Sequence, residues 1–437
     1  MWGWFRRGKR VLTIGSVHLD TIALSRSADK PHEGETEVGS IIHSVGGSAY
    51  NIAANLATHR PKSDGISSVG IYSILPQHSV LTEIIKYKSA AAGVNSRYLR
   101  LHKEFNQKRV RGGGYVAILD EDKRLIRTAV VDAAMYDTNI FEQAEEAATL
   151  EDAIHRADML VIDADLAVAT VNHIADHARR HDKPLFMSIG SVLAGTRTWL
   201  HSNTENVAVC VSGRLLVMCT ILSALKVPAS SIEAFRSFVV SGDRDQPFDI
   251  NEICRLLKTR YLVCSNVRES RGFAVLASGN PAYKSFFATP EDVRHRMQQG
   301  NSAGVVDGAL AGFIDCYAQL LRKGHRADDG SIVSDDTAKM FKANILNFVE
   351  HVSESEGATQ GSVISFEEQA SEQSQLAKLW RLTRIALDML PVFRYLLSIG
   401  ALIIALWLID VALDVLRYFG YDVNILDKPW LRMLLRR

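Results

Sequence analysis

Residues 301–312 read Asn301-Ser-Ala-Gly-Val-Val-Asp307-Gly-Ala-Leu-Ala-Gly312 and place a carboxylate at the mouth of a predicted helix. The helix is predicted because apolar residues recur at i, i+3 and i+4 spacing from Ala309 to Leu321, until Lys323-Gly324 ends the pattern. Backbone N–H groups at a helix N-terminus bind anions, and a carboxylate beside them can take a proton from a hydroxyl. The segment is compatible with phosphoryl transfer, although a capped amphipathic helix that opens on an Asp is also a common structural feature.

Two further segments near the start of the chain carry glycine turns. Val11-Leu-Thr-Ile-Gly15-Ser-Val-His-Leu-Asp20 is predicted to be a buried strand that ends in a glycine turn and an acid. Val45-Gly46-Gly47-Ser-Ala-Tyr-Asn51 follows as a glycine pair that opens a helix predicted over residues 49–59.

In order and separation, these three segments resemble the PfkB (ribokinase-like) family of sugar and nucleoside kinases over roughly residues 9–355. Residues 113–137, 157–166 and 184–192 are most similar to the pseudouridine kinase branch of that family. The resemblance implies ATP and Mg²⁺ as cofactors, with no metal ligand assigned to the protein. It also implies that the acceptor hydroxyls of a sugar or nucleoside are held by Asp20, Gly46, Gly47 and Asn51.

On the phosphate side, the resemblance implies Asp307 as general base and an anion hole or nucleotide contact formed by Gly304, Val305, Val306 and the Asp307 backbone, with Gly272. Here the sequence departs from the family, whose motif usually reads Gly-Ala-Gly-Asp. The family's Asn-x-x-Glu has no clean counterpart, and its Thr-x-Gly-x-x-Gly is replaced by residues 264–272, of which only Gly272 matches. Two functions are therefore considered. The retained Asp307 favours an ATP-dependent kinase, whereas Val306 and the missing Asn-x-x-Glu favour a membrane-attached pseudokinase that binds a sugar-like or nucleoside ligand as sensor or scaffold.

The rest of the chain predicts a three-layer α/β/α sandwich, because short apolar runs alternate with helical periods. A small β lid is predicted from about residues 31–46 and 110–132, where shorter alternating patterns occur. If the lid closes over the acceptor, His43 and His18 become candidate ligand contacts; ordinary structural roles are the alternative. Strands are predicted at residues 11–14, 66–74, 159–162, 185–189, 207–211 and 261–264, with 273–276 as a hairpin partner, and helices at 49–59, 80–92, 167–180, 250–258 and 307–322.

Composition and motifs exclude several other classes of function. The 437 residues carry a formal net charge of +1, which gives no electrostatic case for nucleic-acid binding. The five cysteines form no C-x-x-C pair, so a reducing, cytoplasmic setting is expected for the main domain. H-E-x-x-H, P-loop, G-x-S-x-G and EF-hand patterns are absent from the sequence.

One histidine pattern has two interpretations. His173, His177 and His181 fall at i, i+4 and i+8, which aligns them on one helix face, and two such residues can bind zinc. No acid or cysteine close in sequence completes a tetrahedral set, and charged neighbours favour a solvated helix face.

The two ends of the chain differ from the predicted kinase domain, residues 11–357. Residues 1–10 form a basic and aromatic arm, and residues 358–390 a polar linker with an amphipathic helix. Residues 391–437 contain an uncharged run from Tyr395 to Ile409 with aromatic and basic flanks, which predicts a membrane anchor. The protein is therefore expected at a membrane, with its kinase-like domain in the cytoplasm. A helix packed on the domain or in an oligomer, such as a homodimer, is the alternative.

Overall fold

The computed structural model describes residues 8–25, 39–59, 65–76, 80–102, 114–119, 130–132, 144–189, 206–211, 222–223, 226–241, 249–256, 258–266, 272–277, 284–288, 303–325 and 335–354. All of them belong to the first of two compact units, residues 1–365. Residues 1–7 of the arm predicted at 1–10 lie outside the described residues, as do the predicted linker and membrane anchor at 358–437. The arm is shorter than predicted, because the first strand already begins at Lys9. Among the described helices, none has the length and apolarity needed to cross a membrane.

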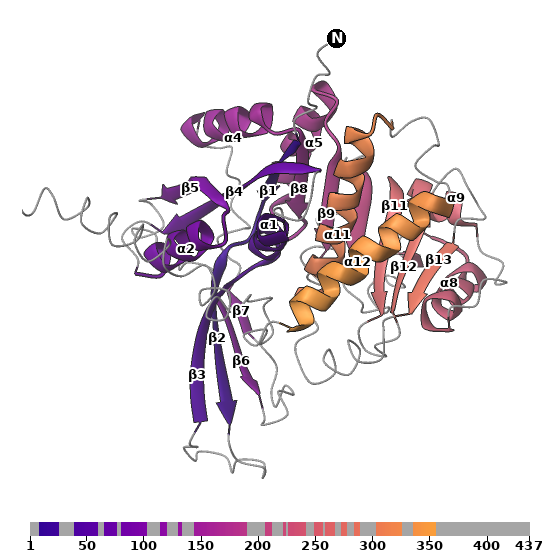
Figure 1. Ribbon diagram of the computed structural model, residues 1–437, viewed down its shortest axis with the longest axis horizontal. Helices are drawn as coiled ribbons and strands as arrows, with labels where there is room; N and C mark the ends of the chain where they lie inside the picture. The colour runs from indigo at the N-terminus through magenta and orange to yellow at the C-terminus, as the bar shows by residue number, and fades with distance from the viewer. Residues whose placement is uncertain are drawn as a thin grey trace, which may run out of the picture. The chain divides into compact units, whose positions relative to one another are not determined.

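A nine-stranded sheet forms the centre of the fold, in the order β13-β12-β11-β10-β9-β8-β1-β4-β5 (Figure 1). Seven of its strands are mutually parallel, so their carboxyl ends meet at one edge. They are β1 (Lys9–Ile14), β4 (Ile66–Pro76), β5 (Asn95–His102), β8 (Met159–Asp163), β9 (Leu185–Ile189), β10 (Asn206–Val211) and β11 (Thr259–Asn266). The hairpin predicted after β11 is confirmed, because β12 (Gly272–Ala277) and β13 (Lys284–Ala288) extend the sheet antiparallel.

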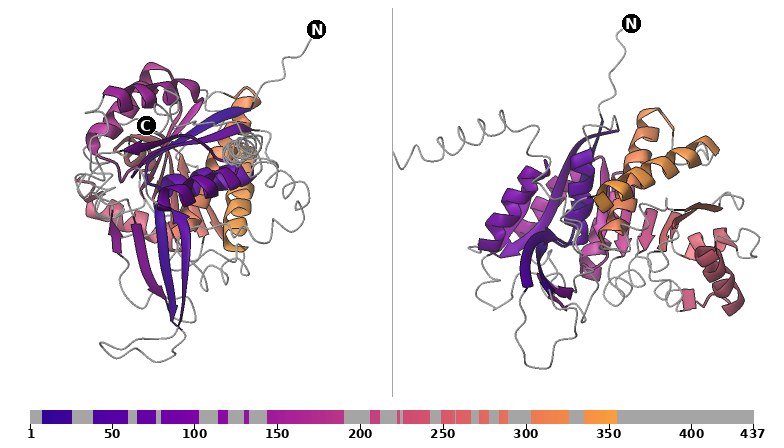
Figure 2. Two further views of the ribbon diagram at one scale, coloured as in Figure 1. Left: turned by 90° about the vertical axis from the view of Figure 1, so that its left-hand side faces the viewer. Right: turned by 60° about the horizontal axis from the view of Figure 1, so that its bottom comes forward.

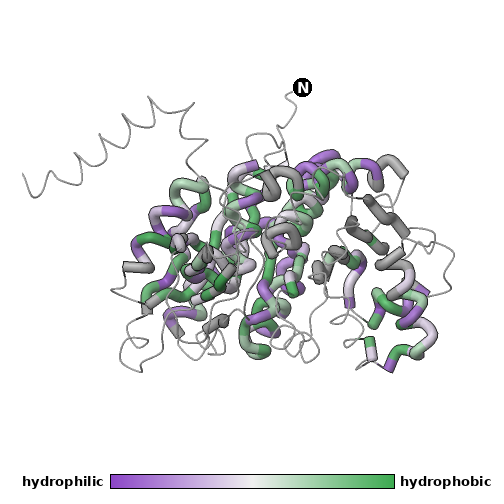
Figure 3. The backbone as a smooth tube through the Cα atoms, turned by 90° about the horizontal axis from the view of Figure 1, so that it is seen from below, coloured by the Kyte–Doolittle hydropathy of each residue, from purple (hydrophilic) through white to green (hydrophobic). Residues whose placement is uncertain are grey.

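Helices cover both faces of this sheet, as the alternating pattern predicted. Leu12 and Ile14 of β1 join a buried core with residues of α4 (Ala144–Arg156), α5 (Val168–Arg180), α8 (Ala229–Ser241) and α9 (Ile250–Leu256). The other face is covered by α1 (Ser48–His59), α11 (Ala303–Arg322) and α12 (Asp335–Glu354), which Figure 2 shows across the strands from α4 and α5. Hydrophobic and hydrophilic residues alternate along many of the helices (Figure 3). This alternation fits the one-sided burial of α5, whereas residues 49–57 of α1 and 307–318 of α11 are all buried.

Helix α11 is held in place by aromatic packing against its neighbours. Phe313 of α11 stacks on Phe341 of α12, with ring centroids 4.5 Å apart, and Tyr317 of α11 meets Phe186 of β9 edge to face. The helix begins at Ala303, one turn earlier than predicted, so Asp307 is its fifth residue. Valine lowers helix propensity by only a few tenths of a kcal/mol, so Val305 and Val306 do not prevent that extra turn.

A second sheet, the lid, has the order β3-β2-β6-β7. Its strands β3 (Gly39–Gly46), β6 (Gly114–Leu119) and β7 (Val130–Asp132) lie in the predicted lid segments. Strand β2 (His18–Ser25) was not predicted, and it places Asp20 inside a lid strand instead of after the first strand of the main sheet. Helix α2 (Val80–Ala91) contacts both β5 and the lid strands β2 and β3. The lid also continues directly from the main sheet, because only residues 15–17 separate β1 from β2.

Candidate active site

Polar side chains from three neighbouring strands meet at the carboxyl edge of the main sheet. Ser16 follows β1, Asp163 ends β8, and Asp163 lies opposite Ser188 of β9 in the strand register. The Ser16 N–H donates to Asp163 Oδ2 at 3.2 Å, and the Ser16 hydroxyl donates to the same oxygen. Asp163 Oδ1 accepts the N–H of Asp165 at 3.0 Å. The carboxylate is almost fully buried, and this burial raises its pKa above the usual range.

The Gly46-Gly47 turn brings helix α1 onto this edge. Gly47 has φ +98°, and a Cβ at that position would lie 2.4 Å from the Ser16 carbonyl oxygen. A Cβ at Gly46 would lie 2.2 Å from Asp20 Oδ2, so glycine is also needed there for close approach of the lid acid. The Ser48 N–H, at the start of α1, donates to Ser16 Oγ at 3.1 Å.

Asn51 and Asp307 meet at the centre of the site although they are far apart in sequence. The amide nitrogen of Asn51 in α1 donates to Asp307 Oδ2 in α11 at 3.0 Å, and both side chains are buried. The pKa of Asp307 is raised to about 8, mainly by burial and in addition by the nearby charge of Asp163. The Asn51 amide opposes this shift, since it stabilises the ionised form. Ser188 and Ser48 act in the same direction, although Ser188 Oγ has no aligned hydrogen bond.

The lid contributes two residues beside Gly46. His18 Nε2 lies 3.2 Å from Asp20 Oδ1 in β2, and both side chains are largely buried. Within the described part of the chain, several buried atoms around this position have no aligned hydrogen bond: Asp20 Oδ1, Ser44 Oγ and Asn51 Oδ1. Leaving a buried polar group unsatisfied costs about 1–3 kcal/mol, so a ligand with several hydroxyl groups would find ready partners here.

The residues predicted for the acceptor side are thus brought together. Gly46 borders Asp20, Gly47 borders Ser16, and Asn51 binds Asp307. His43 does not join them, because it pairs with Thr21 on the lid face opposite Asp20 and is exposed. This position favours the structural alternative for His43, whereas His18, the other candidate ligand contact, lies next to Asp20.

The residues predicted for the phosphate side have different positions. Gly304, Val305 and Val306 form the first turn of α11, where the first four backbone N–H groups of a helix lack helical partners. Within α11 these groups belong to residues 303–305, because the N–H of the fourth helical residue bonds to the carbonyl before the helix, as the Asn51 N–H does to Gly47 at the start of α1. The N–H groups of Val306 and Asp307 therefore fall outside the set, although both were included in the prediction. Gly272 begins β12 opposite Asn266, at the same sheet edge as Asp163 but four strands from β8, about 19 Å away at ordinary strand spacing.

Sequence reasoning did not assign a site role to Ser16, Asp163 or Ser188. The available signal was weak: Asp163 ends a short buried strand, and the carboxyl ends of parallel strands are the usual position of sites in open α/β sheets. Their proximity depends on the order of β1, β8 and β9 in the sheet, which the sequence pattern alone leaves open.

Several solved structures that share this fold are described as ribokinases or carbohydrate kinases. Ribokinase from Giardia lamblia superposes with a TM-score of 0.57 at 12% sequence identity, covering 80% of this chain and 96% of that one. A carbohydrate kinase from Agrobacterium tumefaciens gives 0.55 at 18% identity, covering 80% and 92% of the two chains. Ribokinase from Arabidopsis thaliana, solved with ribose and ATP, gives 0.51 at 14% identity, covering 78% and 99%.

The chain has the ribokinase-like fold. No protein-family model and no curated protein sequence matches it, and at identities this low the structural likeness establishes the fold alone.

The geometry of the glycine turn predicts a stability difference between two Gly→Ala substitutions. Gly93→Ala should cost roughly 1–2 kcal/mol, because its φ is +74° but nothing lies within 4 Å of an added Cβ. Gly47→Ala should cost clearly more, since its φ is also positive, at +98°, and the added Cβ would clash with the Ser16 carbonyl oxygen. Urea unfolding of the two variants, monitored by circular dichroism, measures the difference between their free energies of unfolding. Equal costs would show that the turn can relax away from Ser16.

Proposed function

We propose that this chain transfers a phosphoryl group from ATP to a hydroxyl of a sugar or nucleoside. The observation that carries the proposal is the hydrogen bond from Asn51 to Asp307, which joins an acceptor-side amide to a buried carboxylate one turn inside α11. The kinase structures with the same fold support this reaction class.

The side chains of the site suggest a division of roles. Asp20 and the free oxygen of Asn51 hold acceptor hydroxyls, and Gly46 lets the acid approach closely. Asp307, in its ionised form, takes the proton of the attacking hydroxyl, whose oxygen then bonds to the γ-phosphorus as the bond to the β–γ bridging oxygen breaks. The N–H groups of residues 303–305 stabilise the negative charge on the transferred group.

The residues present fit a nucleotide phosphate better than they fit a dedicated metal site. The first turn of α11 offers N–H donors, whereas the carboxylates of Asp163 and Asp307 already accept hydrogen bonds from Ser16, Asp165 and Asn51. Mg²⁺ is commonly held by substrate phosphates and waters with one or two carboxylates, and it supplies countercharge to the phosphates when bound. The protein's contribution is therefore to orient the phosphoryl group and to control the proton at Asp307.

Within this class, pseudouridine is the acceptor that we propose to test first. The support is the sequence resemblance of residues 113–137 and 157–166 to that branch of kinases. A ribosyl group offers several hydroxyls, which suits the unsatisfied atoms of Asp20, Ser44 and Asn51.

One observation favours a second function, ligand binding without transfer. Val306 stands directly before Asp307, where a glycine is usual in the resembled family, and the raised pKa of Asp307 keeps the carboxyl largely protonated at neutral pH. A pseudokinase of this kind would bind the acceptor at Asp20 and Asn51 without turnover. Calorimetry with the acceptor and turnover with ATP separate the two functions.

The proposed general base predicts loss of turnover in Asp307→Asn. Because the amide cannot accept the hydroxyl proton, kcat should fall about 10²- to 10⁴-fold. Phosphate transfer from radiolabelled ATP to a panel of sugars and nucleosides measures it. Asp315→Asn, an equivalent change two turns further along α11, is the matched control, since the new amide can still accept from Gln319 and Asn344. If the unmodified chain shows no turnover above Asp307→Asn on any acceptor, the kinase proposal fails.

The pKa of Asp307 predicts the pH dependence of that turnover. The base must be ionised, so the rate should rise about tenfold per pH unit below pH 8 and level off above it. Asp163→Asn removes a neighbouring negative charge and should move this rise to lower pH, whereas Asp176→Asn on the surface of α5 should leave it in place. A rate independent of pH between 6 and 9 would contradict the assignment.

We also propose that residues 391–437 attach the protein to a membrane with the kinase-like domain in the cytoplasm. The support is the uncharged run from Tyr395 to Ile409 and its aromatic and basic flanks. The full chain should remain with membranes after alkaline carbonate extraction, and a chain truncated after Gln375 should be released. Recovery of both in the soluble fraction would leave the tail as an oligomerisation or packing helix.

A further inference from the structure

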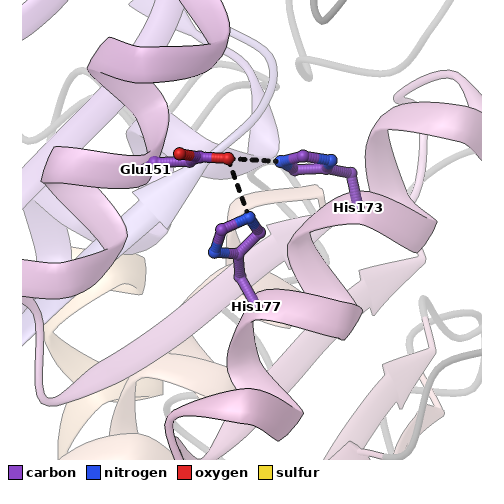
Figure 4. Close-up of side chains that lie close together, drawn as sticks. All are labelled: Glu151, His173 and His177. Carbon is purple, nitrogen blue, oxygen red and sulfur yellow. Dashed lines mark ion pairs between the residues drawn. The ribbon is translucent and has the colours of Figure 1, made fainter.

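A separate cluster of side chains lies between helices α4 and α5. Glu151 projects from α4 toward His173 and His177, which occupy successive turns of α5 (Figure 4). His177 Nε2 lies 3.0 Å from Glu151 Oε1, and His173 Nε2 lies 3.4 Å from the same oxygen. The sequence-based interpretation of a solvated helix face is therefore wrong for His177, which is 7% exposed, and the missing acid is supplied by a different helix.

These distances agree with those between the ligands of a tetrahedral metal ion. With bonds of about 2.0–2.1 Å, neighbouring ligand atoms of tetrahedral Zn²⁺ lie about 3.3 Å apart. All three ligand atoms lie within 4.8 Å of one another, and the two contacts to Glu151 already match the required spacing. The contact of His177 Nε2 with Glu151 is not aligned as a hydrogen bond, so that pairing alone does not satisfy the buried nitrogen.

The chemistry of the cluster fits a borderline divalent cation. Two imidazole nitrogens and one carboxylate oxygen form a donor set that Zn²⁺ and similar ions bind in proteins. Glu151 supplies one negative charge and is about half exposed, which leaves access for an ion and a water as fourth ligand. Arg180 opposes a bound cation, so the carboxylate of Glu151 is needed to offset its charge.

We propose that Glu151, His173 and His177 form a site for Zn²⁺ or a similar transition-metal ion that joins α4 to α5. The site is separate from the candidate active site, because His177 lies nine residues into α5, about 14 Å along the helix from the end near Asp163. The C-terminal end of α4 is already tied by Lys183, whose ammonium donates to the carbonyls of Ile154 and His155. A metal ion would fix the middle of the same interface, so its expected effect is on stability.

Metal titration of the full chain, purified without a histidine tag, tests the site. Zn²⁺ in calorimetry should bind one ion per chain at this cluster, and Co²⁺ should give the visible absorption of a tetrahedral complex. Glu151→Gln and His173→Gln should each weaken binding about tenfold or more, because loss of even an outer partner of a metal ligand costs 10–100-fold. Both changes avoid the buried His177 and so should leave the fold intact.

Two neighbouring substitutions serve as matched controls. Asp152→Asn removes an adjacent acid that pairs with Arg156, and His155→Gln removes an exposed histidine of α4; both should bind the ion as tightly as the unmodified chain. Zn²⁺ should also raise the unfolding temperature of the unmodified chain and of the controls, but not of Glu151→Gln. The proposal is overturned if the unmodified chain takes up no ion at micromolar Zn²⁺, or if Glu151→Gln and His173→Gln bind as the controls do.

Discussion

The hydrogen bond between Asn51 and Asp307 is the interaction on which the rest of the candidate site depends. It connects α1 and α11, two helices that begin near the carboxyl edge of the sheet and pack on the same face of it. Helix α1 reaches this position because the Gly46-Gly47 turn fits against Asp20 and Ser16, and α11 reaches it because Phe313 and Tyr317 are packed among aromatic neighbours. The bond therefore forms only when both helices are correctly placed, although their two residues are 256 positions apart in the sequence.

Burying Asp307 beside Asp163 has a cost in stability that follows from its raised pKa. Between about pH 4 and pH 8 the folded chain holds a proton on Asp307 that the unfolded chain releases, so this carboxyl makes the fold less stable as the pH rises through that range. Asn51 limits the cost by donating to the ionised form. A site that served only structure would gain by replacing Asp307 with a neutral residue, which is why its burial points to chemistry.

Sequence patterns predicted the layers of the fold and most of the strands, because buried parallel strands are short apolar runs bounded by turns. They did not separate β2 from β1, since only residues 15–17 lie between these two apolar segments. They also did not predict α4, because its few large apolar residues are interspersed with alanines and acidic residues and give a weak helical pattern. Asp307 and Asn51 were found through the motifs that contain them. Asp163 and Glu151 were not identified as site residues. Asp163 contacts Ser16 and Glu151 contacts His177, residues far away in the sequence, and no local pattern predicts the packing that brings these pairs together.

Asp307 is a buried carboxyl, and its function as a base requires that its proton is released near pH 8. Carbon NMR of the chain labelled with [γ-¹³C]aspartate measures this directly, and the resonance missing from Asp307→Asn identifies the group. We expect a midpoint near pH 8, moved to lower pH in Asp163→Asn. A midpoint close to the ordinary aspartate value of about 4 would contradict it, because Asp307 would then be neither desolvated nor coupled to Asp163.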